Sequence, residues 1–404
     1  MTASRIVGWL FSATLAATAS SAFADTPVTY AHALALSREL APLTTVARTN
    51  EAVAEADSRI PGIYPNPSVQ AGTNTLNAAR LTLGVSVPLV VLGQRAAALR
   101  AGQAGLAVAK LDTRITLAEV RAATGHAFVA LWLAERTAHA RGDAAQLAQK
   151  LEEVARGRVE LGSAPELDGL RAHAERLRAE MAARSANALV DAAAAELAVW
   201  VGTSINEPLR ASGDPEVPAR LPELGQLSQI SAQTPSIQRA LAEASAGEAR
   251  AASERAQVRP AMILDLGAEL YDPTQSGVNY KAALAVEVPL FNQRGPLIER
   301  EVRSALAARA QARAEQARVS SALLVAYRTF SALTQQVEAL SSGVLPAAIA
   351  AARATEESYV LGRAPLVAVL DAERARIDTE LTLVESQGAR ANVWIDLQRA
   401  LGVQ

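Results

Sequence analysis

The sequence predicts a mixed α+β membrane protein, mainly α-helical, in which a long antiparallel coiled-coil body is joined to four β-strands. Three observations support this fold class: an internal duplication, two very long helical stretches and four short segments of alternating polarity. The chain has 404 residues, of which 50% are hydrophobic but only 4% aromatic. This composition suits closely packed long helices better than a thick globular core.

The duplication is visible in two short motifs. Val-Pro-Leu at 87–89 recurs at 288–290, and Leu-Gly-x-Ala-Pro at 161–165 recurs at 361–365, so the offsets are 201 and 200 residues. Because the spacing is kept over a long stretch, the chain reads as two structural repeats, 25–202 and 223–404. The connector between them, 203–222, contains four prolines.

Residues 1–24 have the pattern of a secretory signal peptide. Arg5 supplies the positive charge, an apolar stretch follows, and Ala22-Phe23-Ala24 forms a small-residue cleavage site. A membrane anchor is the alternative, although the apolar run is short for that role. We therefore expect export of the chain.

Net charge and cysteine content exclude several classes of protein and of binding site. The net charge is −2, so no electrostatic case exists for nucleic-acid binding. The chain has no cysteine, which excludes disulfides, thiolate metal sites and a lipid attached to cysteine. Any membrane attachment must come from the fold itself.

Each repeat presents its helices in the same order. An entering helix is expected over 30–59 and 224–259, a very long one over 94–159 and 297–359, and a returning one over 165–200 and 365–401. At about 1.5 Å per residue the long helix spans about 100 Å, which matches the other two placed end to end. We expect helical hairpins over 94–200 and 297–401, with tips near 162 and 362.

The helices around the first tip carry a heptad pattern, interrupted by Arg158, that is typical of an antiparallel coiled-coil seam. Ordinary helix packing is the alternative. The seam would join Leu147, Leu151, Val154 and Leu161 to Leu167, Leu170, Ala174, Leu177 and Met181, and the second repeat carries Val367, Leu370, Ile377, Leu381 and Val384 in the same register, interrupted by Arg374.

Four segments of about nine residues alternate between apolar and polar side chains, as in a half-buried strand. They form two predicted hairpins, 66–88 and 261–288. Prolines bracket the strands, because proline cannot donate to the ladder: Pro67 and Pro260 precede, and Pro88 and Pro289 end, the hairpins. Tyr64, Tyr271, Tyr280 and Phe291 lie at the strand ends like an interfacial girdle, although chance placement at turns is an alternative.

The strand count decides the architecture. Four strands cannot close a barrel with a polar lumen, and an open sheet edge in hydrocarbon costs several kcal/mol per unsatisfied group. Three chains would give 12 strands, an even number within the usual range. The alternative is two small hairpins in a soluble protein, which leaves the signal peptide and the proline brackets unexplained.

Taken together, these residues resemble the TolC outer-membrane efflux family over essentially the whole mature chain. The most specific motif is Tyr-Val-Leu-Gly-Arg-Ala-Pro at 359–365, followed by Val-Leu-Asp-Ala at 369–372. Tyr-Pro-Asn-Pro at 64–67, Gly-Gln-Arg at 93–95 and the stretch 288–295 resemble the heavy-metal (cobalt-zinc-cadmium resistance) branch. The resemblance implies a homotrimer with a 12-stranded outer-membrane barrel and a coiled-coil helical tunnel across the periplasm.

The resemblance also implies partners and sites. The protein would be the exit duct of a tripartite pump, with a periplasmic adaptor and an inner-membrane pump of RND type. Adaptor docking carries over to the tips, at Leu161, Gly162, Ser163, Leu361, Gly362 and Arg363. The tunnel constriction carries over to Asp168 and Asp371. A further position that is acidic in the family is occupied by Ala368 in this chain. A ring of carboxylates favours cations, although the alternative is that Asp168 and Asp371 are merely solvated or pair with arginines such as Arg171 and Arg374.

No enzyme motif is present. The sequence lacks a phosphate-binding glycine loop, GxSxG and HExxH, and its four histidines are scattered without metal-ligand spacing. We expect no catalytic residue, no cofactor and no resident metal. The leading hypothesis is a passive duct for divalent heavy-metal cations. The alternatives are the same duct for drugs or type I secreted polypeptides, and a soluble periplasmic coiled-coil adaptor.

Overall fold

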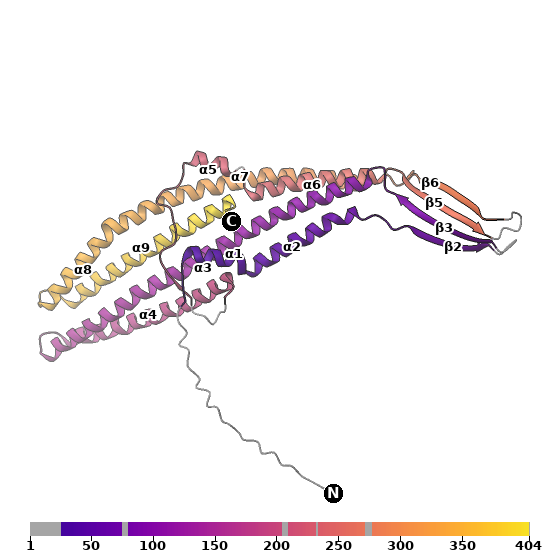
Figure 1. Ribbon diagram of the computed structural model, residues 1–404. Helices are drawn as coiled ribbons and strands as arrows, with labels where there is room; N and C mark the ends of the chain where they lie inside the picture. The colour runs from indigo at the N-terminus through magenta and orange to yellow at the C-terminus, as the bar shows by residue number, and fades with distance from the viewer. Residues whose placement is uncertain (1–25, 75–79, 204–208, 232, 271–276, 404) are drawn as a thin grey trace, which may run out of the picture.

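The protein is an elongated helical body with a four-stranded sheet at one end (Figure 1). The computed structural model describes residues 26–74, 80–203, 209–231, 233–270 and 277–403. The expected signal peptide, 1–24, and Tyr271 lie outside the described residues. No helix in the described part of the chain has both the length and the apolar character needed to cross a membrane.

Two long helices run the length of the body. Helix α3, Gln94–Glu160, is continuous over 67 residues. Its counterpart is α7, Gly295–Ala339, followed by a π-helical turn, Leu340–Val344, and α8, Leu345–Val360. The expected long helical stretch, 297–359, is therefore present, but a π turn interrupts its α-helical hydrogen bonding. Pro346 explains the interruption, because it has no N–H for the carbonyl four residues earlier, and a π turn absorbs the missing bond.

The entering stretch of each repeat is two helices rather than the expected single helix. The first repeat has α1, Tyr30–Leu40, and α2, Pro42–Arg59. The second has α5, Leu224–Ser231, and α6, Pro235–Gln257. Both α2 and α6 begin with a proline, which is favoured at the first helical position and ends a helix placed before it.

The returning helices are α4, Glu166–Val201, and α9, Leu366–Leu401, each of 36 residues. They end at Gly202 and Gly402, whose φ values of 76° and 71° are left-handed. A Cβ at Gly202 would lie 2.7 Å from the carbonyl oxygen of Leu40, and one at Gly402 would lie 2.2 Å from Cδ of Pro235. Glycine thus lets α4 stack on the α1–α2 junction and α9 on the start of α6.

The helices form one curved wall. On one side α3 packs against α2 and α4, and on the other against α6 and α9. Beyond them, α7 packs against α6 and α9, and α8 against α9. The wall therefore has two free edges, one made by α2 and α4 and the other by α7 and α8.

The sheet repeats this order. Its strands are β2 (Ser68–Asn74), β3 (Arg80–Leu89), β5 (Ala261–Leu270) and β6 (Asn279–Glu287), paired antiparallel as β2-β3-β5-β6. Each strand leads into, or follows from, the helix at the same place in the wall (Figure 1). The outer strands β2 and β6 each have one partner in the sheet, so the barrel is open in the single chain.

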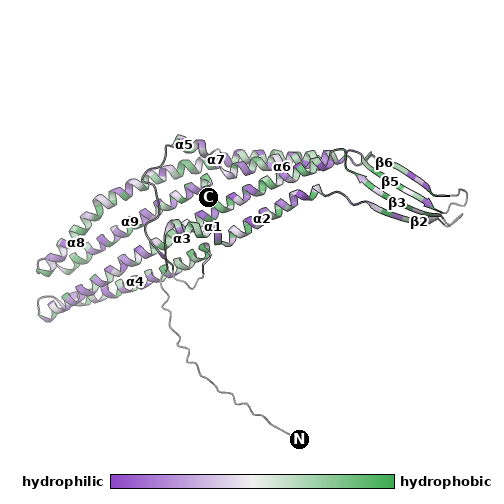
Figure 2. Ribbon diagram, in the orientation of Figure 1, coloured by the Kyte–Doolittle hydropathy of each residue, from purple (hydrophilic) through white to green (hydrophobic). Residues whose placement is uncertain are grey.

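The register segregates polarity across the whole sheet. Leu83 lies opposite Ala71 and Ala268, and Leu266 lies opposite Val85 and Ala282, so most of the large apolar residues of the four strands share one face. Hydrophilic and hydrophobic residues alternate along the strands (Figure 2), and the register places the charged residues Asp265, Glu269, Lys281 and Glu287 on the other face. We call these the apolar face and the polar face.

Three of the four prolines bracket strands as expected. Pro67 directly precedes β2, Pro260 directly precedes β5, and Pro289 lies two residues after β6. Pro88 does not end its strand: it lies inside β3, opposite Ile263. The pairing of β2 with β3 reaches only as far as Ser86, so Pro88 sits where β3 has lost one neighbour, a position that tolerates proline.

A further element lies at the middle of the body and was not expected. Strands β1, Thr26–Val28, and β4, Leu209–Ala211, pair in parallel. Strand β4 lies in the segment expected to be only a connector, 203–222. Around it the largest apolar cluster gathers, with the rings of Tyr30 and Phe128 5.4 Å apart in an edge-to-face contact.

The expected seam of the first hairpin is wrong. Leu170 is 62% exposed and Met181 71%, and Leu161, Leu167, Leu177 and Val154 are exposed as well. Small buried residues such as Ala148, Ala155 and Ala172 join α3 to α4 instead, because alanine lets two helices approach closely. The apolar stripe of α4 (Leu167, Leu170, Ala174, Leu177 and Met181) is therefore left open.

The equivalent stripe of the second repeat is largely covered. Leu370 packs on the core at the tips, Leu381 is 8% exposed, and Ile377 lines a groove among α3, α4 and α9. Only Val367, at the tip end, is exposed. In α9 this stripe faces the neighbouring long helix α3, whereas α4 lies at the free edge of the wall and has no such neighbour in the chain.

Candidate functional site

The two hairpin tips have the same backbone geometry. After α3, the amide of Gly162 donates to the Val159 carbonyl (2.9 Å) and that of Ser163 to the Arg158 carbonyl (2.8 Å). After α8, Gly362 and Arg363 make the same two bonds to Tyr359 and Ser358. Both glycines have positive φ, 68° and 72°, which is the left-handed ending that favours glycine after a helix. The predicted tip residues Leu161, Ser163, Leu361 and Arg363 are all exposed on these turns.

A shared core holds the two tips together. Leu151, Ala155 and Ala172 of the first hairpin are buried against residues of the second, which are Tyr359, Leu366 and Val369. The Arg158 guanidinium lies 4.8 Å from the centre of the Tyr359 ring and donates to the Tyr359 carbonyl at 3.0 Å. The sequence marks Arg158 only as a break in the heptad pattern. In the structure the Arg158 side chain joins the first tip to the second through Tyr359.

Tyr359 is almost fully buried at this contact. Burial raises the pKa of its hydroxyl, the nearby charge of Arg158 opposes that rise, and the carboxylate of Asp168 adds to it. Asp168 thus lies close to the contact between the hairpins. The Tyr359 hydroxyl keeps its proton throughout the physiological range, because the ordinary pKa of tyrosine is already near 10.

The predicted constriction residues differ in their surroundings. Asp168 is half-buried and lies near Tyr359, whereas the Asp371 side chain is 68% exposed. Asp371 approaches Arg374 only at 3.9 Å, and the main partner of Arg374 is Glu175 at 2.6 Å. The alternative pairing of Asp371 with Arg374 is therefore weak, and the carboxylate stays open to solvent.

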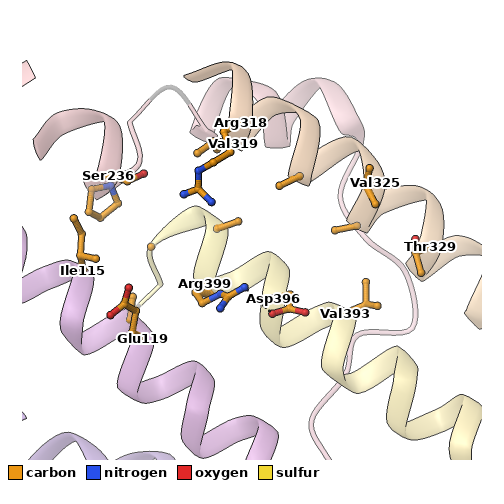
Figure 3. Close-up of a pocket in the computed structure, with 16 residues that line it drawn as sticks. Ile115, Glu119, Ser236, Arg318, Val319, Val325, Thr329, Val393, Asp396 and Arg399 are labelled. Carbon is orange, nitrogen blue, oxygen red and sulfur yellow. Dashed lines mark ion pairs between the residues drawn. The ribbon is translucent and has the colours of Figure 1, made fainter. Parts of the chain in front are cut away.

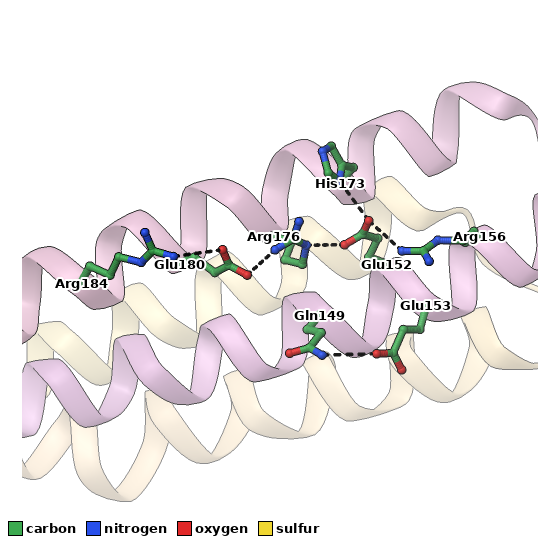
Figure 4. Close-up of polar contacts among 8 residues, drawn as sticks. All are labelled: Gln149, Glu152, Glu153, Arg156, His173, Arg176, Glu180 and Arg184. Atoms are coloured by element: carbon green, nitrogen blue, oxygen red, sulfur yellow. Dashed lines mark hydrogen bonds and ion pairs between the residues drawn. The ribbon is translucent and has the colours of Figure 1, made fainter.

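A buried carboxylate stabilises the first hairpin above its tip (Figure 4). The Glu152 side chain is 9% exposed and accepts from Arg176 Nε at 2.5 Å and Arg156 Nη2 at 3.1 Å, while His173 Nδ1 lies at 3.0 Å. Arg176 also pairs with Glu180. The second repeat has a related arrangement, in which Arg376 bonds the buried Glu373.

This cluster makes hairpin stability depend on pH. The hydrogen bond from His173 and then those from Arg176 and Arg156 lower the pKa of Glu152 below 4.5, against the effect of burial. A carboxyl whose pKa is lowered on folding contributes stability above its unfolded pKa, and that stability is lost as pH falls through the lowered value. We expect the melting temperature of the detergent-solubilised protein to fall as the pH drops from neutral through the lowered pKa of Glu152.

The Glu152→Gln variant is expected to melt earlier at neutral pH and to lose much of that acid dependence. Glu153→Gln is the matched control, because Glu153 is exposed and its hydrogen bond is with Gln149 at 3.4 Å. Equal melting curves for the two variants at neutral pH would contradict the role given to Glu152.

A large groove lies far from the tips, where α9 ends and α6 begins (Figure 3). It has a volume of about 600 Å³ and is lined by α3, α6, α7 and α9. Its charged side chains are largely paired: Arg399 with Asp396 at 3.1 Å, and Arg318 with Glu315 at 2.6 Å. It therefore offers few free polar groups to orient a small ligand. Across the described ranges, no group of three or more His, Cys, Asp or Glu could hold a metal ion.

The comparisons with known proteins agree with this architecture. Residues 226–403 match the model of the family described as "Outer membrane efflux protein". The match therefore covers most of the second repeat. No curated protein sequence matches the chain.

Solved structures with a similar fold include outer-membrane proteins and channels. CusC is 18% identical, with 92% of this chain and 91% of that chain covered and a TM-score of 0.73. The outer membrane protein VceC of Vibrio cholerae is 19% identical, with 92% and 96% covered and a TM-score of 0.75. The CmeC outer membrane channel of Campylobacter jejuni is 15% identical, with 92% and 85% covered and a TM-score of 0.72. At these identities the likeness lies in the fold, which is that of the TolC-like channels.

Proposed function

We propose that this chain is one subunit of a homotrimeric outer-membrane exit duct of a tripartite efflux pump. Its sheet would contribute four of twelve barrel strands, and its helical wall one third of a tunnel in the periplasm. A periplasmic adaptor would bind the tips, and an inner-membrane pump of RND type would supply the cargo. The duct itself would be passive and would use no cofactor.

One observation carries this proposal: the apolar stripe of α4 is exposed while its equivalent on α9 is largely covered. In the chain, the long helix α3 of the first repeat covers α9 of the second. If the repeats alternate around a ring, the stripe of α4 is covered in turn by the long helix of a neighbouring chain, at the free edge made by α7 and α8. Closing the ring also pairs the open edges of β2 and β6.

The faces of the sheet fit a membrane barrel. The apolar face would contact lipid and the polar face would line the lumen. Strand β3 has 10 residues, about 33 Å at about 3.3 Å per residue. Tilted by about 40°, this strand spans about 25 Å, the height of the apolar band of outer-membrane barrels. Three chains give 12 strands.

The tips suit the docking of a periplasmic adaptor. They are exposed, identical in backbone and rigidly joined by Arg158 and Tyr359. We expect Gly362→Arg to abolish export while the trimer stays intact, because the change puts a bulky charge on the docking surface. Resistance of cells to pump substrates and the heat-modifiable trimer band measure the two effects separately.

Gly213→Arg is the matched control for that variant. Gly213 has a φ of 82° and open space around its Cα, so it carries the same backbone cost at a site far from the tips. Unchanged resistance with Gly362→Arg would contradict docking at the turn. Loss of resistance with both variants would point to general destabilisation.

The proposed cargo is divalent heavy-metal cations. Asp371 and Asp168 near the tips would form rings of carboxylates in the trimer, which favour cations. The Tyr-Pro-Asn-Pro segment at 64–67 and the Val-Pro-Leu segments support the heavy-metal branch, although none of these contacts cargo. The alternative is the same duct for drugs or secreted polypeptides. A soluble adaptor is disfavoured by the two-repeat wall and its four-stranded sheet.

Deleting the gene and scoring growth against zinc, cobalt, nickel, cadmium and copper, beside a panel of drugs, tests the cargo. Sensitivity to metals alone supports the proposal. Sensitivity to drugs alone would establish the alternative.

A further inference from the structure

The segments that join the sheet to the helices form a band of apolar and basic side chains, which we call the collar. It consists of 60–67, 90–95, 258–260 and 288–294. The four segments lie together where the helical body ends (Figure 1). We propose that the collar binds anionic phospholipids in the membrane leaflet at this end of the barrel. This inference rests on the proposed function, since it requires the sheet to span a bilayer.

The apolar part of the collar is strongly exposed. Phe291 is 100% exposed, Ile63 72%, Leu290 71% and Val91 65%. Isolated exposed apolar residues are ordinary, but here several gather at one level of the molecule. They lie just beyond the ends of the strands that carry the apolar face. The lipid that covers that face therefore also covers the collar.

The charges of the collar are all positive. Its four segments contain Arg95, Arg259 and Arg294 and no aspartate or glutamate. Of these, Arg294 pairs with Glu254 at 3.0 Å. The other two have neutral partners: Arg95 donates to the Gly62 carbonyl at 2.7 and 2.9 Å, and Arg259 donates to the Leu92 carbonyl at 2.5 Å.

Neutral partners fix the two guanidinium groups without cancelling their charge. Arg95 also lies 4.2 Å from the centre of the Tyr64 ring and 3.1 Å from its hydroxyl, and Tyr64 is 64% exposed. Arg259 is itself exposed and ties the connector of the second repeat to that of the first. In a trimer, six such arginines would lie at headgroup level. An arginine near an anionic lipid surface favours binding by about fivefold.

Tryptophan fluorescence provides a direct test. The Phe291→Trp variant places a reporter in the collar, and Tyr280→Trp places one at the other end of the apolar face, where Tyr280 is 84% exposed. The native tryptophans of the described chain, Trp132, Trp200 and Trp394, lie in the helical body and give an unquenched baseline. Each variant is reconstituted in phosphatidylcholine bilayers containing phosphatidylglycerol, with one lipid or the other brominated.

We expect the reporter at 291 to be quenched several-fold more strongly by brominated phosphatidylglycerol than by brominated phosphatidylcholine at equal mole fraction. The reporter at 280 should show no such preference. Adding Arg259→Gln to the Phe291→Trp variant should reduce the preference about fivefold, whereas Arg259→Lys should keep most of it. Arg353→Gln, an exposed arginine of α8, is the matched control.

The outcomes separate the two proposals. Quenching at both reporters with no preference for phosphatidylglycerol overturns the collar inference but leaves the membrane barrel standing. No quenching at either reporter overturns the proposed function itself. If Arg259→Gln fails to fold, salt decides instead: the preference should weaken as ionic strength rises, and a preference that salt leaves unchanged contradicts binding by charge.

Discussion

Replacing Leu170 by aspartate is expected to convert the trimer into monomers. Leu170 lies in the exposed stripe of α4 and would be covered by the α7 and α8 edge of the next chain. A carboxylate buried there without a partner costs on the order of 3 kcal/mol, and the trimer contains three such interfaces. Size-exclusion chromatography with light scattering, on the protein in detergent, measures the loss of the trimer.

The duplication supplies a control at the equivalent position. Leu370 packs against the tip core within the chain, so Leu370→Asp should lower the melting temperature of the chain itself. Leu170→Asp should instead leave helix content and monomer melting nearly unchanged. A Leu170→Asp protein that remains trimeric would contradict the ring arrangement.

Replacing Gly202 by alanine is expected to destabilise the middle of the wall by on the order of 3 kcal/mol. The residue has a left-handed φ, and the new Cβ would meet the carbonyl group and the Cβ of Leu40, which cannot move aside as the end of a flexible side chain could. The α4 helix could then no longer stack on the α1–α2 junction. Thermal unfolding followed by circular dichroism measures the change.

Gly213→Ala separates the two causes of that loss. Gly213 has a similar φ of 82° but nothing within 4 Å of a new Cβ, so its substitution should cost only about 1 kcal/mol. Equal melting temperatures for the two variants would show that the close contact with Leu40 contributes nothing. Gly402→Ala, facing Pro235, should behave like Gly202→Ala.

Much of the architecture follows from patterns in the sequence. Period-two alternation and the prolines predict four strands with one apolar face, because side chains of a strand point alternately to its two sides. The Leu-Gly turns predict where the long helices end, because the left-handed ending requires glycine. The fold of TolC-like channels follows from the same motifs.

Other features depend on packing that local patterns do not reveal. The heptad leucines of α4 read as a seam of the hairpin, but the alanines beside them form the actual contact. Which side of α4 packs against another helix depends on how all the helices of the wall are arranged. Burial of Glu152 likewise depends on Arg156, His173 and Arg176 meeting from two helices. Strands β1 and β4 have only three residues each, too few for any periodicity to mark them.

The duplication also predicts how neighbouring chains pair. The Val-Pro-Leu segments are 201 residues apart, and Pro67 and Pro260 are 193 apart. Within the chain, Val85 lies opposite Leu266. The equivalent of Val85 in the second repeat, 201 residues later, is Val286 on β6. The equivalent of Leu266 in the first repeat, 193 residues earlier, is Thr73 on β2. Val286 of one chain should therefore lie opposite Thr73 of the next.

Cysteine cross-linking tests this closure most directly, because the natural chain has no cysteine. The double variant Thr73→Cys with Val286→Cys should form a covalent trimer on a non-reducing gel. The control pairs Val69→Cys with Val286→Cys, which shifts one residue by about 13 Å along the strand, beyond disulfide reach. Monomers only with the matched pair, or equal cross-linking with both pairs, would contradict a barrel closed between three chains.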